Sequence, residues 1–396
     1  MTLLVITPSV PVWKTGTALT FDRKFYDGIL LYAQKWPGNI RCVMSQSSTS
    51  PPDFGSVTLD PKELVFECLV LGHRQPIVSN HLNGASIVLA SGDSDSQLHL
   101  SKLCKENNIK CIYIIEYIPE TRYQIVSLST KNPIVRLRRK FHVWKMEQAR
   151  VAAFSLCDGL QTNGTPAYAT YSNVNNRLLY FDTRVFSSQI IDENQLQGRT
   201  DYLAEDKPIR LSFSGRLIGM KGADHLLRLA LLLKQNNVLF ELKIYGSGIM
   251  ESEMRKFIID KNLQNEVIMF GAVDFYDTLI PQLKQSVDIF VCLHRQSDPS
   301  CTYLETLSCG VPIVGYRNRA FGGLLDIANI GWAADLDDLD EICKIIIHLD
   351  RDRSELVRKS KNSLYLALKH DFDSTFQRRV DHLISTANGA MADSVN

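Results

Sequence analysis

One segment in the carboxyl half of the chain combines glycines with two cations. It reads Ser214-Gly215-Arg216-Leu217-Ile218-Gly219-Met220-Lys221-Gly222, between a short apolar run, 209–213, and an amphipathic stretch, 223–235. We therefore expect a strand, a loop and a helix in that order. Glycine permits a tight turn, a helix start offers free amides, and Arg216 and Lys221 add positive charge. This chemistry suits a diphosphate. The alternative is a surface loop with solvated cations, because the P-loop pattern G-x-x-x-x-G-K-[ST] is missing.

Two glycine pairs follow later strands. Gly246-Ser247-Gly248 comes directly after the expected strand 239–245, but Glu251 stands where a dinucleotide fingerprint needs its third glycine. This departure argues against a nicotinamide site. The pair either lets a nucleotide approach the backbone or forms a tight strand-to-helix turn. Phe270-Gly271 ends the next strand, and a simple turn is the safer interpretation there.

A carboxylate lies within the segment from Asp298 to Val314. A Pro-Ser turn leads into a short helix that contains Glu305, and Gly310 ends that helix before another strand. Small residues at 300–302 leave the amides at the helix start open to an anion. Glu305 can accept two hydroxyl hydrogen bonds from a ribose. A solvated helix carboxylate is the less favoured alternative.

Taken together, these segments resemble the family-4 retaining glycosyltransferases of the GT-B fold. The resemblance is carried by G-R-L-x-x-x-K-G at 215–222, Y-G-S-G at 245–248, V-x-x-x-F-G-x-V at 267–273 and L-E-T-L-S-C-G-V-P-I-V at 304–314. It covers residues 209–350 well and the amino half more loosely. It implies an α/β protein with two Rossmann-like, doubly wound domains facing across a cleft. It also implies metal-independent transfer of a sugar, with retention, from a UDP- or GDP-sugar substrate to a glycan or lipid-linked acceptor, without a cofactor, in bacterial polysaccharide or lipopolysaccharide biosynthesis.

The resemblance also assigns roles in the carboxyl half. Arg216 and Lys221 would bind the donor diphosphate and stabilise the leaving group, and Glu305 would hold the ribose. The family's first glutamate falls on Ser297, so either the adjacent Asp298 replaces it or the sugar is recognised differently. The other expected donor-binding residues are Gly215, Gly246, Gly248, Phe270, Gly271, Ser300, Cys301 and Thr302.

Two positions in the amino half are weaker candidates. The family places a histidine or polar group at a strand end facing the sugar, and here the strand 110–115 ends in Glu116. We hypothesise that Glu116 lies in the cleft and orients acceptor or donor hydroxyls; the alternative is an exposed carboxylate where strand meets loop. Gly16, within Thr15-Gly16-Thr17, resembles the small loop that approaches the donor phosphates.

A dense basic stretch, Arg136 to Lys145, interleaves cations with aromatic residues on an expected helix, 134–156. It could contact an anionic membrane surface or a lipid diphosphate acceptor. A solvated helix face is the ordinary interpretation of a charge run. Nucleic acid is not expected, because 44 Lys and Arg nearly balance 43 Asp and Glu.

The remaining pattern describes the elements that must position these residues. Short apolar runs alternate with amphipathic stretches, which is typical of helices covering parallel sheets. We expect an acceptor-side domain at 1–205 that ends in a polar linker from Asp192 to Lys207, and a donor-binding domain at 206–370. A final helix at 371–388 is expected to cross back to the first domain, and a flexible tail follows at 389–396. The first helix is expected at 21–36.

Nine scattered cysteines, no spanning apolar run and no signal peptide favour a reduced cytoplasmic protein, with peripheral membrane contact through 136–145. The alternative function is a non-transferring GT-B protein, such as a nucleotide-sugar epimerase or a sugar-nucleotide binding module.

Overall fold

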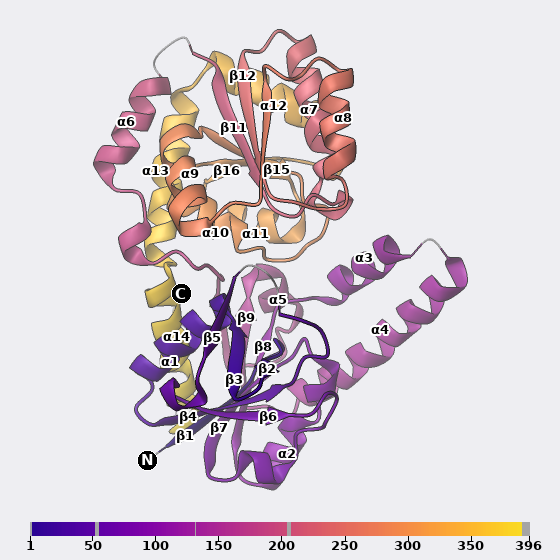
Figure 1. Ribbon diagram of the computed structural model, residues 1–396, viewed down its shortest axis with the longest axis vertical. Coiled ribbons are helices and arrows are strands. Elements are labelled where there is room, and N and C mark those ends of the chain that lie inside the picture. Colours follow the sequence, from indigo (N-terminus) through magenta and orange to yellow (C-terminus); the bar gives the residue numbers. More distant parts are fainter. Residues whose placement is uncertain (1, 52–54, 131, 204–206, 390–396) are drawn as a thin grey trace. The chain divides into compact units, whose positions relative to one another are not determined.

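The computed structural model describes residues 2–51, 55–130, 132–203 and 207–389. The chain forms two compact units, of which the first comprises residues 1–180 and 373–396 and the second residues 181–372 (Figure 1). Each unit is an α/β layer structure built on its own parallel sheet.

The first unit contains a seven-stranded parallel sheet with the order β10-β9-β8-β7-β1-β4-β6. Numbered by position in the chain, these strands run 3-2-1-4-5-6-7 from β6 to β10, so the winding direction reverses between β1 and β7. The strands are β1 Leu3–Thr7, β4 Asn39–Ser45, β6 Glu67–Leu71, β7 Ala85–Ser91, β8 Lys110–Ile115, β9 Gly159–Asn163 and β10 Arg177–Tyr180. The helices of this unit are α1 Arg23–Lys35, α2 Leu100–Glu106, α3 Pro119–Ser129, α4 Pro133–Phe154, α5 Gly164–Thr170 and α14 Phe372–Ala387.

A small antiparallel sheet accompanies the first unit and was missed by the sequence pattern. It comprises β2 Trp13–Thr15, β3 Ala18–Asp22 and β5 Ser56–Leu59. The expected helix at 21–36 therefore begins later, at Arg23, because Asp22 ends β3 and caps the helix by accepting a hydrogen bond from the amide of Phe25 at 2.9 Å. Gly16 lies at the tip of the β2–β3 hairpin with φ of 62°, so the expected phosphate-type loop after the first strand is a hairpin turn.

The last helix, α14, belongs to the first unit from Asp373 onward. Arg379 and Gln161 exchange two hydrogen bonds of 2.9 Å, one from each side chain. Phe376 packs edge-on against Tyr32 of α1, with ring centroids 5.0 Å apart. Of the flexible tail expected at 389–396, residues 390–396 lie outside the described residues.

The second unit contains a six-stranded parallel sheet with the order β13-β12-β11-β14-β15-β16. In chain numbering this is the Rossmann order 3-2-1-4-5-6, and the winding reverses between β11 and β14. The strands are β11 Ile209–Ser214, β12 Phe240–Tyr245, β13 Val267–Gly271, β14 Ile289–Cys292, β15 Ile313–Tyr316 and β16 Gly331–Ala334. The helices are α6 Glu193–Leu203, α7 Ala223–Gln235, α8 Glu251–Asp260, α9 Ile280–Ser286, α10 Thr302–Ser308, α11 Arg319–Ile327, α12 Leu339–Arg351 and α13 Ser354–Lys369.

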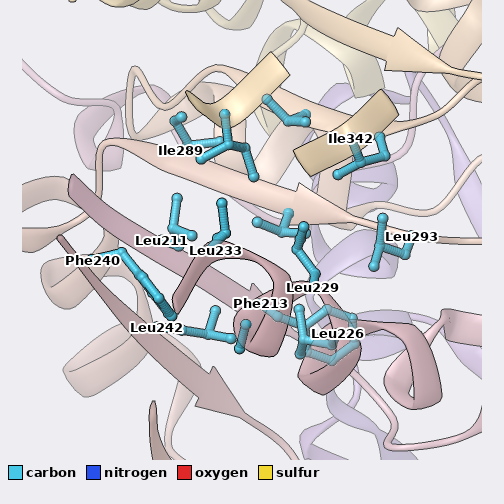
Figure 2. Close-up of a cluster of buried hydrophobic side chains, with 14 of the residues drawn as sticks. Leu211, Phe213, Leu226, Leu229, Leu233, Phe240, Leu242, Ile289, Leu293 and Ile342 are labelled. Atoms are coloured by element: carbon cyan, nitrogen blue, oxygen red, sulfur yellow. The ribbon is translucent and has the colours of Figure 1, made fainter. Parts of the chain in front are cut away.

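The core of the second unit explains why its sheet forms where the apolar runs predict it. Figure 2 shows side chains of β11, β12 and β14 meeting those of α7 and α12 in one buried cluster. Leucines at 226, 229 and 233 recur at helical spacing, so one face of α7 is apolar and buried. Burying such residues contributes about 25 cal/mol per Å² of apolar surface. This packing holds the carboxyl ends of β11 and β14 in place.

The expected domain boundary after residue 205 falls inside the second unit. The polar segment from Asp192 to Lys207 contains α6 rather than a bare linker. Arg199 of α6 is buried and donates hydrogen bonds to the carbonyls of Cys309 and Gly310. The buried side of α6 combines Leu196 and Leu203 with Arg199 and Thr200. This mixture gives a weak apolar pattern, which explains why the sequence suggests a linker.

Candidate functional site: a cavity at the carboxyl ends of the second sheet

The loops that follow β11, β12 and β13 are joined by backbone hydrogen bonds. The amide of Gly215 donates to the carbonyl of Tyr245 at 3.0 Å, and the amide of Gly246 donates to the carbonyl of Gly271 at 2.7 Å. The amide of Leu217 donates to the carbonyl of Ser247 at 2.9 Å. These bonds bring three of the segments singled out in the sequence to one edge of the sheet.

The glycines in these loops are required by close backbone packing. A Cβ on Gly246 would overlap the carbonyl of Gly215, and a Cβ on Gly248 would lie 2.5 Å from the carbonyl oxygen of Leu217. Gly246 also has φ of 126°, which other residues rarely adopt. The tight-turn interpretation therefore accounts for both glycines, while Gly246 in addition borders the cavity.

A cavity of about 180 Å³ opens at this edge. The loops after β11, β12 and β13 form part of its wall, and α10 supplies Thr302 and Glu305. It is lined by Arg184, Ser214, Gly215, Tyr245, Gly246, Ala272, Val273, Leu279, Thr302 and Glu305. Beside it, Tyr245 stacks on Phe270 with ring centroids 4.9 Å apart. Its position agrees with the rule that open α/β sheets bind ligands outside the carboxyl ends of their strands.

Glu305 is buried in the cavity wall and is held by an arginine that the sequence did not reveal. Arg184 Nε donates to Glu305 Oε1 at 2.7 Å. The Arg184 guanidinium also lies over the ring of Phe275, 3.7 Å from its centroid. Burial lowers the pKa of Arg184, but the carboxylate of Glu305 leads the opposing interactions that raise it above its ordinary value overall. Glu305 is therefore a fixed acceptor rather than a solvated helix carboxylate.

The two expected diphosphate cations have different surroundings. Arg216 is exposed, and among the described residues its side chain makes no hydrogen bond or ion pair. Lys221 is 7% exposed, and its Nζ lies 3.2 Å from Asp298 Oδ2. The other oxygen, Asp298 Oδ1, is buried and has no hydrogen-bond partner within the described part of the chain. The pair thus offers an ammonium that can donate to an anion and a carboxylate oxygen that can accept from a hydroxyl.

His294 is a second residue that the sequence motifs did not indicate. It follows β14, is 1% exposed, and neither ring nitrogen has a hydrogen-bond partner among the described residues. Burial, followed by the nearby charge of Lys221, lowers the pKa of His294 well below its ordinary value. Gln296 Oε1 is likewise buried without a partner in the described chain. The neutral imidazole of His294, which lies close to Lys221, and the amide oxygen of Gln296 are therefore candidates for hydrogen bonds to a ligand.

The small residues at 300–302 lie where the sequence predicts, at the start of α10. All three are half-buried, and Ser300 Oγ donates to Thr302 Oγ1 at 3.2 Å. Thr302 borders the cavity, whereas Ser300 and Cys301 are not among the lining residues. Gly271 ends β13 with φ of 76°, in agreement with the simple turn expected there.

The first unit has a separate cavity of about 440 Å³ at the carboxyl ends of β1, β7 and β8. Asp93 lines it and accepts hydrogen bonds from Arg122 Nη2 at 2.6 Å and from the amide of Glu116 at 2.9 Å. Burial raises the pKa of Asp93, although Arg122 and two backbone amides act in the opposite direction. Glu116 accepts from Asn163 Nδ2 at 3.2 Å. It is half-buried at the end of β8, so it is a hydrogen-bonded carboxylate rather than a free surface group.

Comparison with known proteins follows the same division of the chain. Residues 196–364 match the family model described as Glycosyl transferases group 1. The matched segment includes Glu305, Lys221 and Asp298, whereas Arg184 lies before it. The amylovoran biosynthesis glycosyltransferase AmsK of Erwinia amylovora is 24% identical over 163 residues. That alignment covers 38% of this chain and 38% of AmsK.

Solved structures show the fold over nearly the whole chain. HepE of Anabaena, solved in complex with UDP, superposes with a TM-score of 0.65 at 13% identity, covering 98% of this chain and 100% of HepE. The lipopolysaccharide outer core galactosyltransferase WaaB superposes with a TM-score of 0.64 at 13% identity, covering 97% and 99%. The expected fold class, two parallel-sheet α/β domains of the GT-B type, is confirmed. No helix in the described residues has the length and apolar character needed to span a bilayer.

Proposed function

We propose that the protein is a glycosyltransferase that moves a sugar from a nucleoside diphosphate sugar to an acceptor hydroxyl. Two findings that fall on the same part of the chain support this proposal. The cavity with Glu305 in its wall lies at the carboxyl ends of the second sheet, and the glycosyltransferase group 1 match covers the same residues. HepE, which superposes on this chain, was solved with UDP, so UDP is the nucleotide we test first.

In the proposed reaction, the bond between the anomeric carbon and the diphosphate oxygen breaks. Arg216 and Lys221 stabilise the negative charge that develops on the departing diphosphate. The acceptor hydroxyl attacks the anomeric carbon from the face that the diphosphate leaves, and its proton passes to the departing phosphate oxygen. The product retains the anomeric configuration. The mechanism uses no protein nucleophile, no metal ion and no cofactor.

Donor binding is assigned to the carboxylates of the second unit. Glu305 accepts the ribose hydroxyls, and its Oε1 stays bound to Arg184 so that the carboxylate keeps its orientation. The free oxygen of Asp298 accepts a hydroxyl of the donor sugar, which is how Asp298 takes over the role of the glutamate missing at 297. In this scheme Lys221 orients Asp298 as well as binding the phosphate.

The acceptor is proposed to be a glycan or a lipid-linked saccharide in bacterial polysaccharide or lipopolysaccharide assembly. AmsK is described as an amylovoran biosynthesis glycosyltransferase and WaaB as a lipopolysaccharide outer core galactosyltransferase, and both resemble this chain. The cavity of the first unit is the proposed acceptor site, because apolar residues such as Ile125 and Met146 line it together with charged residues such as Asp93 and Arg122. The backbone amide of Glu116 donates to Asp93 and so helps to fix this carboxylate in the proposed site.

The test is incubation of the full-length protein with radiolabelled UDP- and GDP-sugars and with lipid-linked saccharide extracts. The proposal expects label on the acceptor and release of nucleoside diphosphate. An epimerised donor without labelled acceptor, or binding without turnover across the donor panel, would contradict it. NMR of the product distinguishes retention from inversion, and EDTA-treated protein tests metal independence.

Variants of the Arg184–Glu305 pair test nucleotide binding separately. Glu305→Gln keeps the shape but removes the charge, and we expect UDP affinity to fall at least about tenfold, because hydrogen bonds to charged groups contribute about 1.5–3 kcal/mol. Arg184→Gln should weaken UDP binding in the same direction. Glu253→Gln, on the exposed side of α8, is the matched control and should bind UDP as the wild type does. Unchanged affinity in Glu305→Gln would remove Glu305 from the site.

A further inference from the structure

The outer face of α4 exposes an apolar stripe. Ile134, Leu137, Phe141 and Trp144 recur at intervals of three and four, which places them on one side of a helix. Their exposed fractions are 78%, 72%, 63% and 51%. Phe141 and Trp144 stack on each other with ring centroids 5.6 Å apart. We call these four residues the α4 stripe.

The buried positions of α4 lie on its other side. Arg150, Ala153 and Phe154 are buried at its carboxyl end, and the more amino-terminal part packs against α3. In Figure 1, α3 and α4 extend away from the sheet of the first unit. Most surface helices bury their apolar side and expose their polar side. In α4 four large apolar residues are each at least half exposed, so packing within the first unit does not explain the stripe.

Cations border the α4 stripe. On a helix, Arg138 and Lys145 fall along one margin of the stripe and Lys140 along the other. Among the described residues, none of these three side chains makes a hydrogen bond or an ion pair. The sequence from 133 to 146 contains five Lys and Arg residues and no Asp or Glu. The stripe and its margins therefore form an apolar surface with a positive rim.

We propose that the outer face of α4 docks on the surface of an anionic lipid bilayer. Helices that lie in a membrane interface combine Trp, Phe and Leu on one side with Lys and Arg at the headgroup level. Trp is also enriched at this depth because its ring is amphipathic. Each Lys or Arg near an anionic bilayer strengthens binding about fivefold. A second copy of the chain fits less well, because two such faces would bring like charges together.

The experiment uses the full-length protein and two kinds of vesicle, one of phosphatidylcholine and one of phosphatidylethanolamine with phosphatidylglycerol. We expect cosedimentation with the anionic vesicles only, weakening as salt is raised. Trp144 is the tryptophan with a largely exposed side chain, so its fluorescence should shift to the blue on binding. Failure of the wild type to bind anionic vesicles at low salt would overturn the proposal.

Two variants and two matched controls locate the surface. Arg138→Gln/Lys140→Gln/Lys145→Gln should weaken vesicle binding on the order of 100-fold, and Leu137→Ser/Phe141→Ser/Trp144→Ser should abolish it. The controls make equal changes at exposed positions elsewhere: Lys62→Gln/Lys105→Gln/Lys361→Gln and Leu239→Ser/Ile249→Ser/Ile259→Ser.

Both controls should bind as the wild type does. If a control loses as much binding as its partner variant, the surface is not α4 and the proposal fails. If the wild type self-associates by light scattering through the stripe and ignores vesicles, the occupant is a second copy and the proposal also fails. The assay needs neither donor nor acceptor, so its outcome is independent of the proposed transferase activity.

Discussion

At the scale of single residues, substitution of the exposed cation of the donor site should affect stability differently from substitution of the buried cation. Arg216 has no partner to lose among the described residues, so Arg216→Gln should leave the unfolding free energy unchanged within about 0.5 kcal/mol. If Arg216 stabilises the leaving group, turnover should fall about 100- to 1,000-fold, the cost of removing one such charge-stabilising donor. Steady-state kinetics and urea unfolding measure the two effects. Arg228→Gln, an exposed arginine on α7, is the control and should keep full turnover.

Lys221 and Asp298 form a buried pair, and their substitution separates stability from activity. Lys221→Met alone leaves Asp298 buried without its cation, so we expect about 3–5 kcal/mol of destabilisation. Lys221→Met/Asp298→Asn removes both charges and should regain most of that stability. Both variants should transfer sugar about 100- to 1,000-fold more slowly than the wild type, because the phosphate has lost the Lys221 ammonium and keeps Arg216 alone. Recovery of turnover in the double variant would show that the pair is only structural.

At the scale of elements, α14 connects the stability of the first unit to pH. Burial lowers the pKa of His382 from 6.5 to about 4, and His382 Nε2 lies 2.9 Å from Asn176 Oδ1. The folded state therefore binds fewer protons than the unfolded state between these values, so stability falls as pH drops below about 6.5 and levels off near 4. From pH 7 to pH 5, His382 should remove roughly 2 kcal/mol.

The measurement is urea unfolding of wild type and His382→Gln at pH 7 and pH 5. Gln can keep an amide donor to Asn176 but does not titrate, so the variant should lose less stability on acidification than the wild type. The pKa of His294 is lowered too, so acidification also reduces stability through His294. Because both proteins contain His294, the difference between their losses of stability reports on His382. Equal losses in the two proteins would contradict the assignment.

The elements also show which parts of the fold the sequence could predict. Helix α7 forms at 223–235 as expected, because its apolar spacing and its core contacts agree. β2 has three residues, of which two are exposed and one is half-buried, so it is too short and too exposed to show an alternating pattern. The sequence pattern suggests a linker over α6 because the buried side of this helix mixes Leu196 and Leu203 with Arg199 and Thr200, which gives a weak apolar signal.

The site was predictable only where local sequence determines it. The loops at 215 and 246 were found because glycine and cation spacing are local features. Arg184 meets Glu305 across 121 positions of the chain, and no local pattern connects them. His294 is distinguished only by its burial and its unpartnered nitrogens, which require the folded structure.

At the scale of the whole molecule, each unit supplies a distinct part of the proposed activity. The second unit holds the proposed donor site, and the first unit holds the proposed acceptor cavity and the α4 stripe. Val143 and Met146 of α4 line that cavity, while the stripe lies on the opposite side of the same helix. Membrane docking would therefore bring the acceptor cavity close to lipid-linked substrates.

This arrangement predicts that the acceptor's location decides which kinetic constant changes. With the acceptor embedded in anionic vesicles, Arg138→Gln/Lys140→Gln/Lys145→Gln should raise the apparent KM for the acceptor at least tenfold, because fewer enzyme molecules reach the surface. With a detergent-free, water-soluble acceptor analogue, the same variant should match the wild type in both kcat and KM, since these cations touch neither cavity. Lys62→Gln/Lys105→Gln/Lys361→Gln carries the same net charge and should behave as the wild type with both acceptors. A variant that is equally impaired on the soluble acceptor would place the defect in catalysis, and the link between docking and acceptor delivery would then be wrong.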